Sequence, residues 1–407
     1  LIVPWLDSSG NGWTILQRSL YMSKIFKERT SEFQARMSEA NIDAMILMDP
    51  DSIYYFTAFW GDLGVEFGRP SIVTIPRNEE PIIITSSIEG EMCKRMSWIS
   101  KIHLYHDSVG REWIDHLETI LAKYKNHKIA VIPNKVPSLV LNYFHKTDWI
   151  NKLINGESIL SLQRMIKSPE EIKHLRQAGQ VATAMTDAAK AVIAEGISEY
   201  EIAIACQAGG TRKAAEIIES EDMNSLMSPV IHNLQSINSG PHTSMGHLHP
   251  TVRRLKKGDP VYLCFCAICH FKQLKIGYDR QYYVGEISDE HARIYEIAVE
   301  AQQASIKEMK PGVTAEQVNA ASDEVYKSHD MGFCYRTGRA VGYSSLEKPE
   351  LKKGDKTILS AGMVFAVDGG VTIPDKFGAR IGDTILVTEN GSECITEYPR
   401  NEPVIKG

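Results

Sequence analysis

The sequence predicts a mixed α/β (α+β) protein of two domains, and three observations support that prediction. The chain has 407 residues, room for two or three domains of about 150 residues each. Up to roughly residue 150, short apolar runs alternate with amphipathic helical stretches, which favours a sheet layered with helices. Beyond residue 168, long helices are followed by groups of strands, twice. We therefore predict an N-terminal α/β domain over residues 1–160 and a C-terminal domain over residues 161–407.

The elements of the N-terminal domain follow from periodicity and turn residues. Apolar residues recur with helical spacing over residues 28–40 and 113–124. Short apolar runs of strand length occupy residues 43–48, 71–75, 81–85 and 129–132. Asp49-Pro50 is expected to end the first strand, and residues 76–80 form a turn between the next two.

The C-terminal domain opens on a clear helix start. In Ser168-Pro169-Glu170-Glu171 a serine can cap the helix, proline suits its first turn, and acids favour its positive end. The predicted helices cover residues 169–195, 198–219, 289–308 and 314–329. The predicted strands cover residues 261–267, 280–284, 364–367 and 383–387.

Composition excludes several classes of protein. Lys and Arg number 45 against 51 Asp and Glu, giving a formal charge of -6, which argues against nucleic acid as the main partner. The sequence contains no run of about 18 apolar residues, so no membrane partner is expected. Seven cysteines, an odd number in a long chain, suit a reducing cytoplasm better than a disulfide framework.

Two polar segments are candidates for chemistry. Arg69, held between Gly68 and Pro70, could present its guanidinium fork to a carboxylate, or be a plain loop residue. Three histidines lie in residues 239–250, and His247 is one of them. Imidazole titrates near neutrality, so a loop histidine can serve as an acid–base group, although exposed loop histidines without a role fit the pattern equally well.

Cysteines and acids form a second set of candidates. Cys264 and Cys266 alternate along a predicted strand and so face one side of it. A zinc site would need a second ligand pair at a distance, and none is evident, so buried cysteines acting as small hydrophobes are expected. Asp279 and Asp368 lie near the ends of apolar strands, where an acid is costly unless it is paired or used.

Several motifs together resemble the "pita-bread" family (peptidase M24), which contains creatinase, aminopeptidase P, prolidase and methionine aminopeptidase. They lie at residues 168–172, 257–263, 361–367 and 385–391. The resemblance covers most of the chain and implies an N-terminal creatinase-like domain before a C-terminal pita-bread domain. It also implies a homodimer with active sites shared between subunits.

The peptidases of that family hold two metal ions with two Asp, one His and two Glu. The matching positions here are Cys264, a position at or near Gly277, Arg339, Asp368 and Gly382. At most one oxygen ligand survives, and a cationic arginine repels a divalent ion. The resemblance therefore leads us to expect neither a metal site nor any other cofactor.

The metal-free creatinase branch shares further features. Phe67-Gly68-Arg69-Pro70 is similar to the stretch in which that branch uses Phe and Arg to contact its substrate, and His247 matches its catalytic histidine in spacing. Asp279 and Asp368 stand where creatinase has substrate-binding Glu residues, and Arg339 could serve as a second carboxylate-binding arginine.

These features predict a metal-independent hydrolase that cleaves a C–N bond, other than a peptide bond, in a small zwitterionic substrate. His247 would act as general base and acid, while the other groups hold the substrate. Four alternatives stay open: an ectoine-hydrolase-like enzyme, Cys264 as a nucleophile, a metal-dependent Xaa-Pro peptidase or lyase of the same fold, and a non-catalytic binding module.

Overall fold

The computed structural model describes residues 15–61, 63–107, 110–125, 127–221, 226–231, 236–266, 270–332, 336–401 and 403–405. The chain divides into two compact units, residues 1–163 and 164–407. Each unit combines a sheet with helices, so the predicted mixed α/β architecture in two parts is confirmed.

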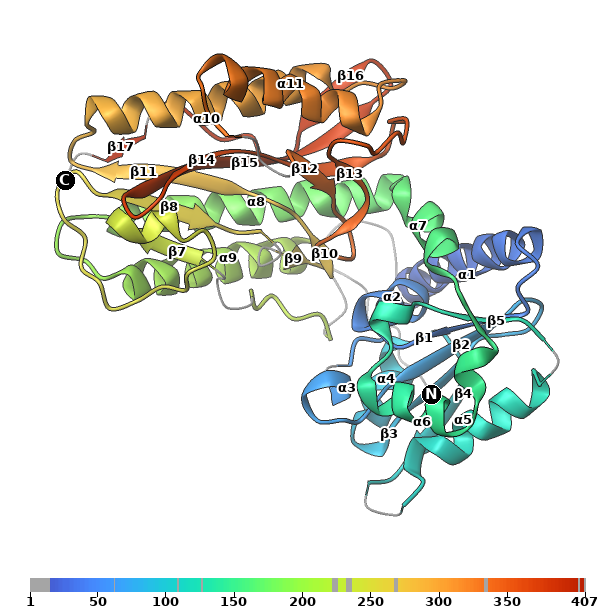
Figure 1. Ribbon diagram of the computed structural model, residues 1–407. Helices are drawn as coiled ribbons and strands as arrows, with labels where there is room; N and C mark the ends of the chain where they lie inside the picture. The colour runs from blue at the N-terminus through green and yellow to red at the C-terminus, as the bar shows by residue number, and fades with distance from the viewer. Residues whose placement is uncertain are drawn as a thin grey trace. The chain divides into compact units, whose positions relative to one another are not determined.

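The N-terminal unit contains a six-stranded sheet in the order β4-β3-β2-β1-β5-β6 within the described residues (Figure 1). Its strands are β1 (Ala44–Leu47), β2 (Ile72–Pro76), β3 (Ile82–Ser86), β4 (Lys101–Tyr105), β5 (Ile129–Val131) and β6 (Leu153–Asn155). Its helices are α1 (Ile15–Glu39), α2 (Pro50–Thr57), α3 (Leu63–Glu66), α4 (Gly90–Met96), α5 (Glu112–Lys123), α6 (Ser138–Lys146) and α7 (Glu157–Met165). Short 3-10 turns are η1 (Ser87–Glu89), η2 (Pro133–Lys135) and η3 (Trp149–Asn151).

Asp49-Pro50 ends β1, as predicted, but it also starts α2, which the sequence analysis missed. The Asp49 carboxylate accepts a hydrogen bond from the Ser52 backbone N–H at 3.1 Å, and Pro50 occupies the first turn. The sheet then buries its apolar side chains against α5 and α6, through a core that includes Ile46, Ile84, Trp113, Leu117 and Phe144.

The C-terminal unit is built on a nine-stranded sheet whose main path is β13-β12-β14-β15-β11-β8-β7 in the described residues. Its strands are β7 (Ser236–Ser239), β8 (Pro260–Cys264), β11 (Asp279–Val284), β12 (Gly338–Ala340), β13 (Glu347–Leu351), β14 (Val364–Ile373), β15 (Phe377–Thr388), β16 (Gly391–Cys394) and β17 (Val404–Ile405). A separate small hairpin pairs β9 (His270–Phe271) with β10 (Leu274–Lys275). β14 and β15 extend well beyond the strands predicted at 364–367 and 383–387, because their glycines continue in ladder pairing.

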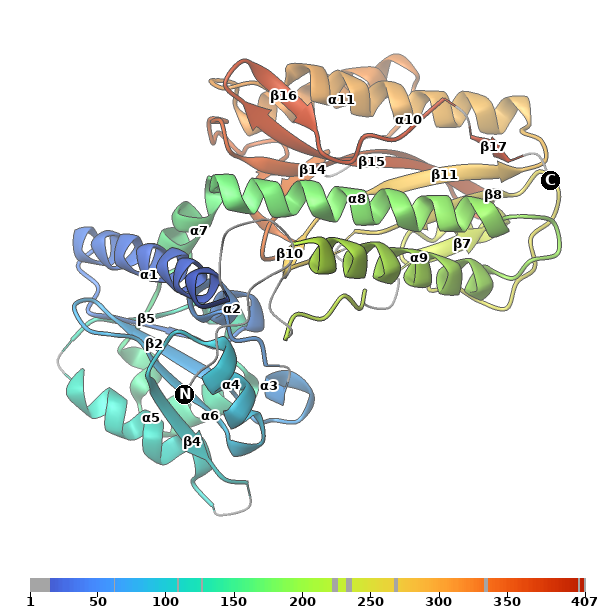
Figure 2. The same cartoon turned by 180° about the vertical axis from the view of Figure 1, so that it is seen from behind.

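Four long helices accompany this sheet: α8 (Pro169–Val192), α9 (Glu199–Ser220), α10 (Asp289–Glu308) and α11 (Ala315–Ser328). Ser168 and Glu171 form the reciprocal capping box expected at the start of α8. α8 and α9 pack along each other, as do α10 and α11 (Figures 1 and 2). The two pairs match the duplication suspected from the sequence.

The helices contact one face of this sheet. On that face Thr186 of α8 donates a hydrogen bond to the Tyr278 hydroxyl at 3.2 Å, and Gln302 of α10 donates to Asp383 at 3.0 Å. α10 also approaches β14 so closely that a Cβ on Gly369 would lie 2.0 Å from the Ala298 carbonyl oxygen. The opposite face of the sheet therefore carries the side chains that alternate with these.

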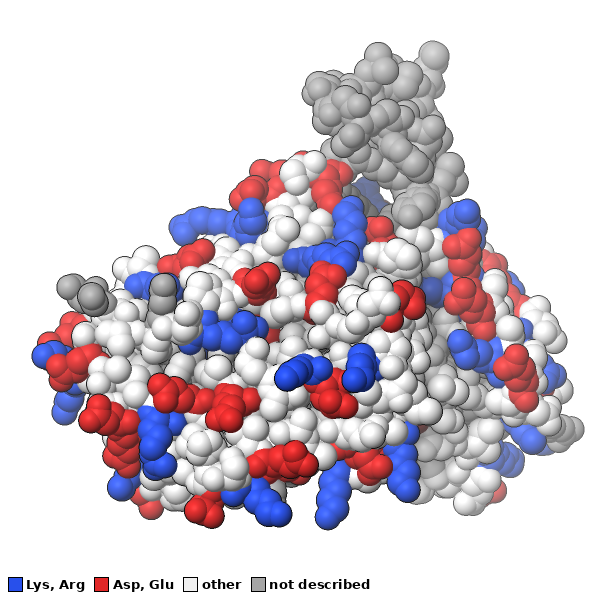
Figure 3. Space-filling view, turned by 90° about the horizontal axis from the view of Figure 1, so that it is seen from above, with Lys and Arg blue, Asp and Glu red and all other residues white. Residues whose placement is uncertain are grey.

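Among the helices that the structure describes, none combines the length and the apolar character needed to cross a bilayer. On the face of the molecule shown in Figure 3, acidic and basic side chains are interspersed.

Candidate active site

One row of residues crosses five neighbouring strands on the sheet face opposite the helices. Asp368 of β14 is paired with Gly382 of β15, which is paired with Asp279 of β11. Asp279 is paired in turn with Cys264 of β8, and Cys264 with Ser236 of β7. Directly opposed residues in an antiparallel ladder point to the same face. The register therefore gathers side chains that lie more than 100 residues apart in sequence.

Two carboxylates in this row meet above a glycine. A Cβ added to Gly382 would lie 2.6 Å from Asp368 Oδ1 and 3.1 Å from Asp279 Oδ2. No described residue donates a hydrogen bond to the buried Asp368 Oδ1, while Oδ2 lies 3.4 Å from Arg339 Nη1. Burial and then the like charge of Asp279 raise the pKa of Asp368 to about 7. Asp368 lies within β14, so the predicted end of that strand at residue 367 is wrong.

Two thiols border the same acids. The Cys266 thiol donates to Asp279 Oδ1 at 3.6 Å, and both Cys264 and Cys266 are buried. Hydrogen bonding with Cys266, followed by burial, raises the pKa of Cys264 well above its usual range. A neutral thiol is a poor nucleophile, so this environment gives no support to Cys264 as a nucleophile. Residues 267–269, which continue the cysteine motif, lie outside the described residues.

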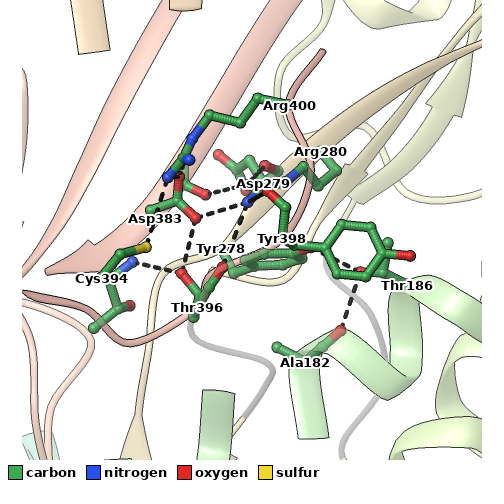
Figure 4. A network of polar contacts seen from close by, with 12 residues as sticks. Ala182, Thr186, Tyr278, Asp279, Arg280, Asp383, Cys394, Thr396, Tyr398 and Arg400 are labelled. Carbon is green, nitrogen blue, oxygen red and sulfur yellow. Dashed lines mark hydrogen bonds and ion pairs between the residues drawn. The ribbon is translucent and has the colours of Figure 1, made fainter. Parts of the chain in front are cut away.

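The neighbouring residues Arg280 and Asp383 point to the helix-covered face and pair with each other there (Figure 4). Arg280 Nη2 contacts Asp383 Oδ1 at 2.8 Å, and Arg400 Nη2 contacts Asp383 Oδ2 at 2.8 Å. Thr396 also donates to Asp383 Oδ1 at 2.9 Å. This network fixes β11 and β15 side by side, and so holds Asp279 opposite Gly382.

Arg380 is a site residue that the sequence analysis missed. It lies two positions before Gly382 on β15, so its side chain emerges on the same face as the acid pair. Its Nη2 donates to Thr372 at 3.0 Å, whereas its buried Nε has no hydrogen-bond partner among the described residues. The alternation in Ala379-Arg380-Ile381-Gly382 was the signal that could have found it.

His247 lies in the loop after η4 (Gly240–Ser244), and its side chain is exposed. Two hydrogen bonds attach this loop to the sheet: Ser236 Oγ donates to the Gly246 carbonyl at 3.2 Å, and the Gly378 N–H donates to Thr243 Oγ1 at 3.0 Å. Ser236 belongs to the cross-strand row of site residues. His247 therefore directly follows a residue, Gly246, that is hydrogen-bonded to the edge of the site. His242 has a different task, with its Nδ1 3.1 Å from the fully buried Glu199.

Phe67 and Arg69 belong to the N-terminal unit. Phe67 is 63% exposed, and Arg69 Nε forms an ion pair with Asp107 Oδ2 at 2.7 Å. Their predicted contact with a substrate stays a prediction, as does the homodimer.

The five positions that would carry the dinuclear ligands do not fit two metal ions. Gly277 and Gly382 offer no ligand side chain, and Arg339 can only donate hydrogen bonds. The packing has closed around the first glycine, because a Cβ on Gly277 would lie 2.4 Å from Ala366 Cβ. Of the family's oxygen and nitrogen ligands, only the Asp368 carboxylate stands in place.

Comparison with known proteins gives a consistent relationship. Residues 173–389 match the family described as "Metallopeptidase family M24", and residues 29–166 match the "Creatinase/Prolidase N-terminal domain". The chain is 27% identical to an Xaa-Pro dipeptidase of Pyrococcus furiosus, over 92% of this chain and 99% of that protein. It is also 27% identical to an "Agropine synthesis cyclase" of Rhizobium rhizogenes, over 92% and 96%. A prolidase structure from Thermococcus sibiricus has the same fold, with a TM-score of 0.80 at 24% identity, over 93% of this chain and 99% of that one.

These relatives correct the predicted activity. The prediction of a metal-independent, creatinase-like hydrolase acting on non-peptide C–N bonds is wrong, since several relatives along nearly the whole chain are Xaa-Pro dipeptidases. The prediction gave a few local positions, such as Asp279 and Asp368, more weight than the similarity of the whole chain. It also equated the loss of one ligand set with the loss of metal, although other ligand atoms can occupy the same sheet face.

Proposed function

Because this chain belongs to metallopeptidase family M24, we propose that it is a dipeptidase, hydrolysing the peptide bond of a small zwitterionic dipeptide of the Xaa-Pro class. The names of several relatives support the reaction. The observation that carries the proposal is a site with opposite charges at a fixed spacing. Arg380 lies on the same face of β15 as Gly382, above which the acids of β14 and β11 meet.

The spacing of these groups matches the length of a dipeptide. Two residues along a strand rise about 6.7 Å, which separates Arg380 from Gly382. A dipeptide backbone spans at most about 7 Å from its amino group to its carboxylate. A bound dipeptide can therefore place its carboxylate against Arg380 while its ammonium group lies between Asp279 and Asp368.

The charges of the site support this orientation. A carboxylate pairs with a guanidinium through charge-assisted hydrogen bonds, and Arg380 Nε has no partner in the described structure. The substrate ammonium would relieve the repulsion between the two acids and supply a donor to Asp368 Oδ1. Arg339, already beside Asp368, would limit the negative charge around the reacting bond.

His247 is our candidate for moving protons at the edge of the site. It is near the site row through its loop, and an exposed imidazole can exchange protons with water. The proposal retains Phe67 and Arg69 as further substrate contacts, a homodimer and a cytoplasmic location.

The test is an assay of the purified full chain with Xaa-Pro dipeptides, with divalent cations added, following release of free proline. Arg380→Ala should raise KM by about 10–100-fold, because a hydrogen bond to a charged group contributes roughly 1.5–3 kcal/mol. The same variant should differ far less from wild type on the matching dipeptide amide, which has no carboxylate. Absence of hydrolysis for every dipeptide, or equal effects on acid and amide, would refute the proposal.

The histidine assignment has its own control in the same loop. His247→Ala should lower kcat by about 10²–10⁴-fold if it carries protons, whereas His249→Ala, also exposed, should leave kcat unchanged. Equal behaviour of the two variants would remove His247 from the proposal.

Ring closure in a small molecule is a second candidate function. It is favoured by the 27% identity to the Agropine synthesis cyclase over 96% of that protein, together with the missing dinuclear ligands. Mass spectrometry of products separates the two reactions, because hydrolysis adds the atoms of one water molecule and a dehydrative cyclisation removes them.

A further inference from the structure

Asp279 of the acid pair converges with two cysteines to give three potential metal ligands, and of these only Cys264 holds a family ligand position. Cys264 Sγ, Cys266 Sγ and a carboxylate oxygen of Asp279 all lie within 4.8 Å of one another, and all three residues are buried. The two cysteines point to one side because they are two residues apart, and Asp279 is the direct cross-strand partner of Cys264. The neighbouring strand thus supplies one ligand that is distant in sequence, although not the second pair sought from the sequence.

The distances suit one small ion with tetrahedral geometry. Zinc–sulfur bonds are about 2.3 Å, which places two sulfur ligands roughly 3.8 Å apart, and zinc–oxygen bonds are about 2.0–2.2 Å. The observed Cys266 Sγ to Asp279 Oδ1 distance is already 3.6 Å. Inward shifts of about 1 Å at most would bring the remaining atoms to bonding positions.

The Asp279 carboxylate also lacks a cation. Its residue is only 5% exposed, yet no described lysine, arginine or histidine forms an ion pair with it within 4.0 Å. Its one described side-chain hydrogen bond comes from a weak thiol donor. Buried charges in proteins are normally paired or bound to a metal, and Asp383 on the other face has two arginines.

Arg339 does not oppose a single ion here. Two thiolates and one carboxylate around a divalent cation leave one negative charge, and Arg339 beside Cys266 and Asp368 neutralises it. Thiolates are soft ligands that select ions such as Zn²⁺ over Mg²⁺ or Ca²⁺. The set therefore differs in number, donor type and ion preference from the five-ligand dinuclear site.

We propose that Cys264, Cys266 and Asp279 bind one thiophilic divalent cation, such as Zn²⁺, with its fourth position open to water or a substrate group. Binding releases the two thiol protons to solvent. Asp279 is also one of the two acids that the proposed function places against the substrate ammonium group, so a bound ion would leave that group to Asp368. Ion binding is measured without substrate, so its failure is distinguishable from a failure of dipeptide hydrolysis.

The test is cobalt loading of the purified full chain after chelation, read by absorbance and elemental analysis. Co²⁺ bound by thiolates gives an intense near-ultraviolet charge-transfer band, so we expect that band at one Co²⁺ per chain, and its displacement by Zn²⁺. Cys264→Ser and Cys266→Ser should each weaken Co²⁺ binding at least about tenfold and reduce the band. Asp279→Asn should weaken binding while the band persists at saturation.

Cys394→Ser is the matched control, since Cys394 is a half-buried free cysteine on β16, outside the cluster. It should bind Co²⁺ as the wild type does, and circular dichroism should show that every variant is folded. A band that survives in the double variant of Cys264 and Cys266 would overturn the proposal. Two ions per chain without a thiolate band, or no Co²⁺ binding at all, would do so as well.

Discussion

The two faces of the C-terminal sheet treat buried charge in opposite ways. On the helix-covered face, Asp383 receives two arginines and a threonine hydroxyl, so each of its oxygens is occupied. On the other face, one residue away along the same strands, Asp279 has a thiol and Asp368 has a single distant arginine contact. Asp279 and Asp383 are both buried, so exposure does not explain why only Asp383 has described ion-pair partners, whereas the Asp368 side chain is 33% exposed.

This difference separates the charges around Asp383, which stabilise the fold, from those of Asp279 and Asp368, which can bind a ligand. A buried ion pair that loses one member leaves an uncompensated charge, which costs several kcal/mol. An acid pair with an orphaned oxygen and a raised pKa is already under strain, and a bound ammonium group or cation would relieve it. Variants on the helix-covered face should therefore lower stability, whereas variants on the opposite face should mainly weaken ligand binding.

The largest expected loss of stability is on the helix-covered face. Asp383→Asn should lower the free energy of unfolding by about 3–5 kcal/mol, because Arg280 and Arg400 would keep buried charge without a counter-ion. Urea denaturation followed by circular dichroism measures this change. Asp368→Asn is the comparison on the face opposite the helices. It should lower the free energy of unfolding by less than about 1 kcal/mol, since it removes like-charge repulsion. Equal losses would erase the distinction between the faces.

A second buried cluster of paired charges, formed by Glu347 with Arg164 and Lys167, predicts how stability depends on pH. Burial by itself raises the pKa of Glu347. The charges of Arg164 and Lys167 lower that pKa by a larger amount, so it falls from an ordinary 4.5 to about 2. A lowered folded-state pKa adds stability above the unfolded pKa, so about 3 kcal/mol should be present above pH 4.5 and lost towards pH 2. The stability difference between wild type and Glu347→Gln should shrink over that range. A difference that stays constant with pH would contradict the pairing.

Gly382→Ala tests whether the space between the two acids, on the face opposite the helices, is needed for activity. The added methyl group would collide with the Asp368 and Asp279 carboxylates at 2.6 and 3.1 Å, so it should cost about 1–3 kcal/mol of stability and abolish turnover of dipeptides. Gly332→Ala is the control, because no atom that the structure describes lies within 4 Å of its Cβ position. Normal turnover by Gly382→Ala would show that substrate does not enter between the acids.

The smallest effect is expected for an exposed pair. Arg176 donates two hydrogen bonds of 2.8 Å to Glu393, but both side chains are largely in solvent. Arg176→Ala should therefore change the free energy of unfolding by only about 0.2–1 kcal/mol. Measured in parallel with Asp383→Asn, it calibrates how much burial contributes to an arginine–carboxylate pair.

The elements of the fold were largely predictable because their signals are local. The capping box at Ser168 and the periodicity of residues 289–308 predicted α8 and α10 within a few residues. α2 was not predicted, because Asp49-Pro50 both ends a strand and starts a helix. β14 was predicted too short, since Gly369 and Gly370 favour a turn unless a helix packs against the strand, as α10 does.

The candidate site was only partly predictable, because it depends on register between distant strands. The cost of burying an acid identified Asp279 and Asp368, but only ladder pairing shows that they meet above Gly382. Arg380 escaped notice for the same reason, as its role depends on which face of β15 it occupies. The resemblance to creatinase was misleading because single positions do not determine which bond is cleaved.

The adjacency of Asp279 and Arg280 has a consequence for assembly of the sheet. If β11 shifted by one residue against β15, every side chain would exchange faces. A shift in one direction would place Arg280 directly opposite Arg380, and a shift in the other direction would place Asp279 directly opposite Asp383. Either mispaired register would thus set two like charges directly opposite each other, which destabilises it relative to the native register.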